Sequence, residues 1–459
     1  MNSSMPTLLD PLVQTITQEV KNAVSNKTVI PEQRLWVEWK LSSFEYTDDG
    51  VSTGMANGNQ VSRPDWFGAP RLLEPRITTL AIYQTTLDAL KKDYPNQASA
   101  MPDCLGKFTL MAIGIVLSDS DNVKVTELEN LCTSFLNDLA GGPITHRAKV
   151  NLGGVVLRSS SIQIAVGIRL RQPTREDIEI ASPAVQFVHL QNPIAKTPQA
   201  IAEIEYIGAR DQTMELQREV GRFISVLRLF DVGSVLYTSY QMESNAILSA
   251  WGAHMTLGSG ISATAGERYV IKQEDEDRLK MFWRTMSHTI PNGFYDFQKQ
   301  VSHLTLAYDR YSDAILHNGI VERRIANAVM GLEALLLGET QELNYRLGLR
   351  IAKALSLVGK KPLEVRQRIH DAYRIRSLFA HGGHLSYKEK ARLERRYGDM
   401  KKFTLPLFDY LRSLIILMIS LHCDKEEVID LLDDALIDQE KHESLKSRVS
   451  PLTSLISSP

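Results

Sequence analysis

The chain has 459 residues, of which 43% are hydrophobic and 23% are charged, and its formal net charge is −2. This length predicts two or three domains, and the ordinary composition argues against disorder. The near-zero charge excludes binding of nucleic acid through the field of the whole molecule, so any such contact requires a local basic surface. The three cysteines lie far apart without a CxxC pair, so they indicate neither a disulfide framework nor a cysteine zinc site.

The first third of the chain reads as mainly helical. Apolar residues recur at helical spacing over 5–24 and again over 73–92. Between them, 36–46 is aromatic and alternating, and a Gly-, Asn- and Ser-rich loop follows it to about Arg63, as in a turn or hairpin tip. Another helix is predicted over 124–139, where a Gly-Gly-Pro sequence ends it.

The next part of the chain has the alternation of β-strands. Residues 161–171 place aliphatic side chains on one face and polar or small residues on the other, the cleanest strand pattern in the sequence. Further strands are predicted at 184–190, 202–208 and 234–240, with a helix among them at 214–230. We therefore expect a sheet with a covering helix between about 145 and 270.

Beyond an acidic connector at 272–277 the pattern becomes helical. Short, glycine-marked connections between the apolar stripes favour antiparallel neighbours in a bundle. The predicted helices cover 278–288, 295–316, 320–337, 341–358, 364–381, 404–422 and 425–438.

Together these patterns predict an α+β fold, in which a mixed N-terminal region with a β-sheet precedes an all-α helical bundle. The expected divisions are a mainly helical region at 1–145, a mixed α/β sheet region at 146–271, a bundle at 278–440 and a flexible tail at 446–459. The first two regions are compatible with a single sensor domain.

The sequence has no pattern of a secretory signal or of a membrane span. Its first residues lack a basic start and a long apolar run. The most apolar window, 411–422, has six consecutive strongly apolar residues, whereas a bilayer span needs roughly 20. We therefore expect a buried core helix at this window and a cytoplasmic protein without membrane contact.

The candidate chemistry lies in AYRIRSLFAHGGH, residues 372–384. Arg376 and His381 are separated by four residues, which puts them about 140° apart around a regular helix. The two glycines after His381 predict that the helix ends there, where the negative end of its dipole favours a cation. A histidine can exchange protons near neutral pH, and an arginine can hold a phosphate or a phosphorane oxyanion. These are the parts needed to cleave RNA through its own 2′-hydroxyl without a metal.

Taken alone, an Arg–His pair at this spacing is also what solvated or capping residues produce by chance. The local charge pattern gives modest support for a nucleic-acid site. Residues 360–402 contain 13 Lys and Arg against 5 Asp and Glu, whereas residues 424–443 contain 2 against 9. A basic patch attracts a phosphate backbone, although ordinary solvated faces give similar counts.

Three blocks place this motif in a wider context: ERRIANAVMGLEALLLG (322–338), ELNYRLGLRIAKALSLVG (342–359) and IHDAYRIRSLFAHGG (369–383). Over roughly 280–422 the chain resembles the HEPN superfamily, in its Apea-like branch. The third block contains the R-x4-6-H motif of that family, with the polar Ser377 after Arg376. The resemblance implies a HEPN-like helical bundle that dimerises, with Arg and His of both subunits meeting at the interface. It also implies metal-independent endoribonuclease activity, often in phage defence, stress response or toxin systems.

Two more residues are candidates for supporting roles beside Ser377. Arg374 is separated from His381 by six residues, which also fits the motif, so the arginine assignment can shift by two positions. Glu333 is an acid on an otherwise apolar face, where it can orient Arg376 or the nearby Arg346, or form an ordinary salt bridge.

No metal or other cofactor is expected. His370, His381 and His384 lie at spacings that match no standard ligand set, and no acidic partner accompanies them.

The predicted function is therefore a HEPN-type endoribonuclease that acts on RNA as a homodimer, with the N-terminal region sensing an unknown activating ligand or protein. One histidine does not easily serve both proton transfers, and a two-fold dimer supplies a second. The sequence also has more apolar residues than the packing of one helical face needs, which favours a dimer interface. These residues are Leu335, Leu336, Leu337, Leu378 and Phe379. The alternatives are a non-catalytic dimerisation or RNA-binding module, with the N-terminal region as the working part, or an accessory to a nucleotidyl-transfer or toxin partner.

Overall fold

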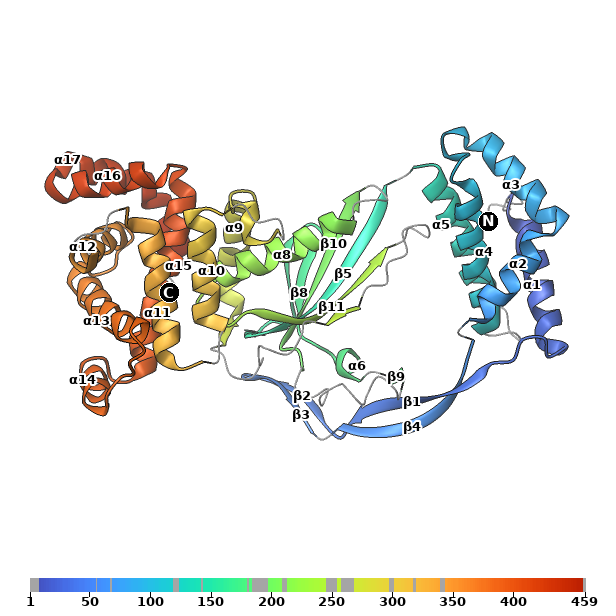
Figure 1. Cartoon of the computed structure of the whole chain (residues 1–459), viewed down its shortest axis with the longest axis horizontal. Coiled ribbons are helices and arrows are strands. Elements are labelled where there is room, and N and C mark those ends of the chain that lie inside the picture. The colour runs from blue at the N-terminus through green and yellow to red at the C-terminus, as the bar shows by residue number, and fades with distance from the viewer. Residues whose placement is uncertain are drawn as a thin grey trace.

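The computed structural model is an α+β protein, which confirms the expected fold class. A β-sheet-containing N-terminal part is followed by a C-terminal region of helices, and the sheet lies between two helical ends (Figure 1). The structure describes residues 8–456 except for 55, 67, 119–123, 142, 180, 184–196, 209–212, 245–253, 257–267, 297–300, 317–318 and 339–342. The strand predicted at 184–190 lies outside the described residues.

The N-terminal helices pack around their own hydrophobic core. They are α1 (Asp10–Ser25), α2 (Ala69–Thr78), α3 (Ala81–Asp93), α4 (Met101–Ser118) and α5 (Val125–Leu139). In α1 the fully buried side chains are Leu12, Ile16 and Val20, which recur every four residues and so share one face. The buried core formed by these helices is separate from the core of the rest of the chain.

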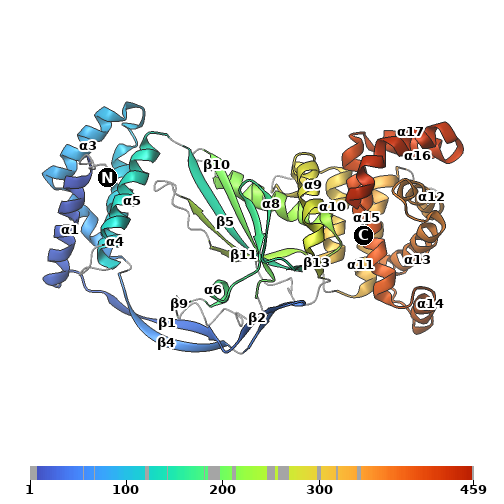
Figure 2. The same ribbon diagram turned by 180° about the vertical axis from the view of Figure 1, so that it is seen from behind.

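A long antiparallel hairpin runs from these helices toward the central sheet (Figures 1 and 2). It consists of β1 (Glu32–Leu41) and β4 (Ala56–Asp65), with the short β9 (Ala181–Pro183) on the other side of β1. A smaller hairpin of β2 (Phe44–Thr47) and β3 (Gly50–Thr53) lies between them in sequence. The stretch predicted as a loop up to Arg63 is thus largely strand. Its polar residues have weak strand propensity, and pairing with β1 supplies the order that local sequence does not.

Within the part of the chain that the structure describes, the central sheet has six strands in the order β12-β11-β5-β10-β8-β7, all paired antiparallel. The strands are β5 (Ile144–Gly153), β7 (Ser161–Ala165), β8 (Ile168–Arg171), β10 (Ala200–Gly208), β11 (Leu236–Ser244) and β12 (His254–Thr256). The helix predicted at 214–230 is α8 (Thr213–Phe230), which packs against β5 and β10.

The single strand predicted at 161–171 is two strands, β7 and β8, joined by a tight turn at Val166 and Gly167. Val166 is fully exposed, and Gly167 has φ = +76°, a left-handed conformation that glycine adopts without steric cost. Because the alternation of apolar and polar residues in the sequence continues through the turn, with Val166 at a position that the pattern assigns to the inner face, sequence periodicity does not reveal the turn.

The C-terminal helices surround one long, largely buried helix, α15 (Met400–Leu421). The others are α9 (Glu276–Met286), α10 (His303–Leu316), α11 (Val321–Leu336), α12 (Leu343–Ser356), α13 (Pro362–Ala380), α14 (Tyr387–Tyr397), α16 (Lys425–Ile437), α17 (Gln439–Val449) and α18 (Thr453–Ile456). Leu335 and Leu336, counted above toward a dimer interface, are fully buried within this protomer, so they do not require one.

One continuous hydrophobic core spans the sheet, α8 and the C-terminal helices. The connector at 272–277 therefore does not divide that core, although it does separate the strand-bearing part from the helical part. Arg412 of α15 crosses this boundary: it is fully buried and donates to the backbone carbonyls of Leu229 and Phe230 at the end of α8, at 2.8 and 3.0 Å.

The tail expected to be flexible at 446–459 is ordered as far as it is described. It contains the end of α17 and the short α18, and Leu455 and Ile456 are buried in the common core. The carbonyl oxygen of Ile456 also accepts a 2.7 Å hydrogen bond from Arg412. The Ser- and Pro-rich composition concealed these anchoring apolar residues.

By length and composition alone, α4 and α15 are apolar enough to cross a membrane. In the structure, 50% and 78% of the residues in these two helical windows are buried against protein. Because core helices of this kind pass the same test, the finding is weak evidence for a membrane, and the cytoplasmic location stays a prediction.

Candidate functional site

The helix α13 carries the Arg–His motif and ends at the motif's histidine. Pro362 occupies its first turn, where a missing N–H has no cost. At the other end the amides of His381, Gly382 and Gly383 donate back to the carbonyls of Ser377, Phe379 and Leu378. Gly382 has φ = +77°, a left-handed conformation that terminates helices. The structure thus ends this helix where the glycine pair predicted.

Arg376 forms an ion pair with Glu333 of α11. Its Nη2 atom lies 3.0 Å from Glu333 Oε2, and the two side chains are 31% and 15% exposed. The Arg376 guanidinium also lies 5.9 Å from the ring centroid of Tyr373, one turn earlier on α13. Among the described residues, Arg376 Nε has no acceptor and Glu333 Oε1 has no donor, although both atoms are shielded from solvent. The pair therefore retains hydrogen-bonding capacity.

Burial raises the pKa of Glu333, and the neighbouring Arg376 offsets only part of that rise. Burial likewise raises the pKa of Tyr373, with Glu333 adding to the rise and Arg376 opposing it. Desolvation acts on a carboxylate in this way because the charged form loses its hydration. Glu333, which sequence left with two possible arginine partners, thus contacts Arg376.

His381 lies at the exposed end of α13, and its side chain has no hydrogen-bond partner among the described residues. Five residues of helix separate it from Arg376 by about 140° and about 7.5 Å along the axis. A single protomer therefore does not bring both side chains into one cluster. Ser377 is half-buried, and its carbonyl accepts the His381 amide.

Arg374 points to a different neighbour. It forms a 2.7 Å ion pair with Glu389 of α14, whose carboxylate also accepts from the Ser386 amide and hydroxyl in a capping box. The Arg374 side chain is thus engaged where α14 docks on α13, whereas Arg376 faces α11.

A buried carboxylate fixes the basic helix α14 against α13. Asp371 is 2% exposed and accepts hydrogen bonds from Arg396 and Tyr397 at 2.7 and 2.8 Å, and from Arg392 at 3.3 Å. A buried carboxylate with several donors holds them in one geometry, because the loss of one donor leaves a buried carboxylate oxygen without its hydrogen bond. The basic stretch noted in the sequence is therefore partly structural, and its exposed members include Lys388 and Arg395.

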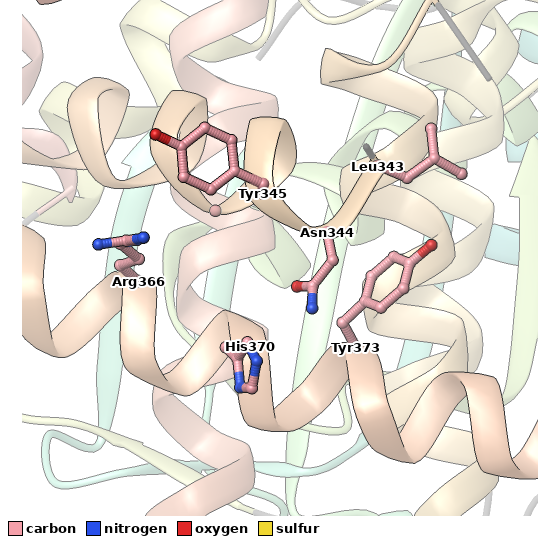
Figure 3. A pocket seen from close by; sticks show the side chains of 7 residues that line it. Leu343, Asn344, Tyr345, Arg366, His370 and Tyr373 are labelled. Carbon is pink, nitrogen blue, oxygen red and sulfur yellow. The ribbon is translucent and has the colours of Figure 1, made fainter. Parts of the chain in front are cut away.

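A groove of about 860 Å³ lies between α12 and α13, beside the Arg376–Glu333 pair. Its described lining residues are Leu343, Asn344, Tyr345, Gly348, Arg366, His370 and Tyr373 (Figure 3). The sequence patterns described above did not predict this groove. The available signal was the recurrence of polar or aromatic side chains at 366, 370 and 373, the i, i+4, i+7 spacing of one helical face.

Comparison with protein-family models, curated proteins and solved structures produced no match. The likeness to the HEPN superfamily therefore rests on the three sequence blocks quoted above. No group of three or more His, Cys, Asp or Glu side chains in the described part of the chain is arranged to hold a metal ion.

Proposed function

We propose that this protein is a metal-independent endoribonuclease of HEPN type that acts as a homodimer. The observation that carries the proposal is the half-buried Arg376, held by Glu333 beside an open groove, on the same helix whose exposed end carries His381. The combination offers a fixed cation for a phosphate and an accessible imidazole for proton transfer.

The reaction uses the substrate's own nucleophile. His381 accepts the proton of a ribose 2′-hydroxyl, and the freed oxygen attacks the adjacent phosphorus while the bond to the 5′-oxygen breaks. A second His381, from the partner subunit, donates a proton to that 5′-oxygen. Arg376 stabilises the charge on the phosphorane oxygens. The products are a 2′,3′-cyclic phosphate and a free 5′-hydroxyl.

Two features of the protomer support a dimer as the active form. The Arg376 guanidinium and the His381 imidazole lie on different sides of α13, so a two-fold partner is the simplest way to complete a site. The half-buried Leu378 and Phe379 lie between them on the same helix.

The N-terminal helices, which have their own core, are the proposed sensor for an activating ligand or protein.

The test is incubation of the purified chain with total RNA in EDTA, followed by analysis of the cleaved ends. We expect cleavage with 2′,3′-cyclic phosphate ends, and no cleavage of the matching DNA. His381→Ala should lower the rate by roughly 10²–10⁴ per proton-transfer role, and Arg376→Ala should also abolish cleavage. His384→Ala, an exposed histidine three residues away, is the matched control and should cleave like the parent. Activity that disappears in EDTA and returns with Mg²⁺ would refute the mechanism.

A non-catalytic role is the second candidate, because the Arg376–Glu333 pair also joins α13 to α11 as a purely structural ion pair would. In that case the chain would bind RNA or dimerise, and His381→Ala would change neither property. Sedimentation of the parent at micromolar concentration tests the dimer directly. A fully active monomer would contradict the proposed two-fold site.

A further inference from the structure

We propose that the groove between α12 and α13 binds a nucleobase of single-stranded RNA next to the bond that is cut. This inference rests on the proposed function, because it names how the same enzyme holds and selects its substrate. Asn344 and Tyr345, in the first turn of α12, form one wall, and Arg366, His370 and Tyr373 of α13 form the other (Figure 3).

The groove offers aromatic surface from both helices. Tyr345 is 56% exposed, and the Arg366 guanidinium lies 5.6 Å from its ring centroid, whereas Tyr373 approaches from α13. A planar base can stack on a tyrosine ring whatever its identity, and arginine strengthens such sites through cation–π contact. Single-stranded RNA presents its bases in this unstacked form.

The groove also contains a polar group that has no hydrogen-bond partner among the described residues. Figure 3 shows the Asn344 amide pointing into the space between the two helices, toward His370 and Tyr373. Its Oδ1 atom is shielded from solvent and accepts no hydrogen bond from the described residues. Shielded polar atoms normally have a hydrogen-bond partner. The polar edge of a base that enters the groove can supply the donor that Asn344 Oδ1 lacks among the described residues.

The charge of the lining residues favours an anionic ligand over a basic or purely apolar partner. The described lining residues include Arg366 and His370 but no aspartate or glutamate. The groove also adjoins the proposed phosphate-binding cation, since the Arg376 guanidinium lies 5.9 Å from the ring of Tyr373. A base against Tyr373 thus brings its own phosphate near Arg376.

The experiment measures binding of the full chain to fluorescent RNA hexamers that are 2′-O-methylated throughout, so that they cannot be cut. One hexamer carries bases and the other is abasic with the same phosphates. Tyr345→Ala should weaken binding of the base-bearing hexamer about 10-fold, within the range for loss of one stacked base, and leave the abasic hexamer unchanged. The base-bearing hexamer is made in four versions, each with a single kind of base. Asn344→Asp should change the order of affinity among these four hexamers, because it replaces an amide donor with an acceptor. Tyr387→Ala is the matched control, since that tyrosine is 89% exposed on α14, outside the groove.

Several outcomes would overturn the inference. The first is that Tyr345→Ala weakens binding of the base-bearing and the abasic hexamer equally. The second is that Tyr345→Ala leaves the affinity for both hexamers unchanged, and the third is that the parent chain binds neither hexamer. A shift of Tyr345→Ala from dimer to monomer in sedimentation would instead assign the groove to contact between two copies. Because the hexamers cannot be cleaved, a chain that binds as expected but never cuts RNA would refute the proposed function alone. A chain that cuts RNA equally well with Tyr345→Ala, and with unchanged base preference, would refute the groove alone.

Discussion

Replacement of Arg412 by Met tests whether the sheet and the C-terminal helices depend on one another for stability. The side chain is fully buried and donates to the carbonyls of Leu229, Phe230 and Ile456, and it pairs with Asp409 at 2.6 Å. Methionine has a similar length but no donors, so the substitution removes every one of these bonds at once.

The expected loss follows from these contacts. Removing one partner of a buried ion pair costs about 3–5 kcal/mol, and a buried carbonyl left without a donor costs about 1–3 kcal/mol. Lys360 remains 2.7 Å from Asp409 and compensates its carboxylate, so the contributions do not simply add. We therefore expect the free energy of unfolding to fall by about 3–5 kcal/mol in Arg412→Met.

Urea unfolding measures that loss, and hydrogen exchange followed by mass spectrometry locates it. Protection should fall at the end of α8 and in α18 as well as in α15. The matched control is Arg350→Met: Arg350 is also buried, but it pairs with Asp433 and the Leu336 carbonyl inside the C-terminal helices. Arg350→Met should destabilise the C-terminal helices without increasing hydrogen exchange at the end of α8. A loss below about 1 kcal/mol in Arg412→Met, or unchanged exchange in α8, would refute the reasoning.

Three further predictions concern the stability of the fold and the docking of α14. Gly154→Ala should destabilise the protein by at least about 1–3 kcal/mol in urea unfolding, because φ is +78° and the added carbon would collide with the Ser234 carbonyl; equal stability would contradict this. Asp371→Asn should speed hydrogen exchange in α14 selectively, since its arginine partners lose their charged acceptor; uniform exchange rates would exclude a docking role. Burial alone would raise the pKa of Asp409, but Arg412 and Lys360 outweigh it and hold that pKa below its ordinary value. The stability advantage of the parent over Asp409→Asn should therefore be complete above the ordinary aspartate pKa and decline as pH falls through the lowered one; an advantage that grows in acid would contradict the assignment.

The sequence by itself determined those elements whose signal is local. The apolar stripes of α5, α8, α11 and α15 repeat at helical period, and their residues are buried as that period requires. The end of α13 was equally readable, because Gly382 and Gly383 supply a left-handed helix stop without any help from distant residues. The α+β class follows from the same local patterns.

Tertiary structure alone decided the features that depend on partners far away in the sequence. The polar β4 is a strand because β1 pairs with it. The tail after 446 is ordered because Arg412 of α15 donates a hydrogen bond to the carbonyl of Ile456. The pairing of Arg376 with Glu333 and the groove beside it depend on how α11, α12 and α13 lie against one another. Periodicity reports which face of an element is apolar, but not which other element covers that face. The sequence therefore offered Glu333 as a partner of either Arg376 or Arg346, and only the packing of α11 against α13 decided between them.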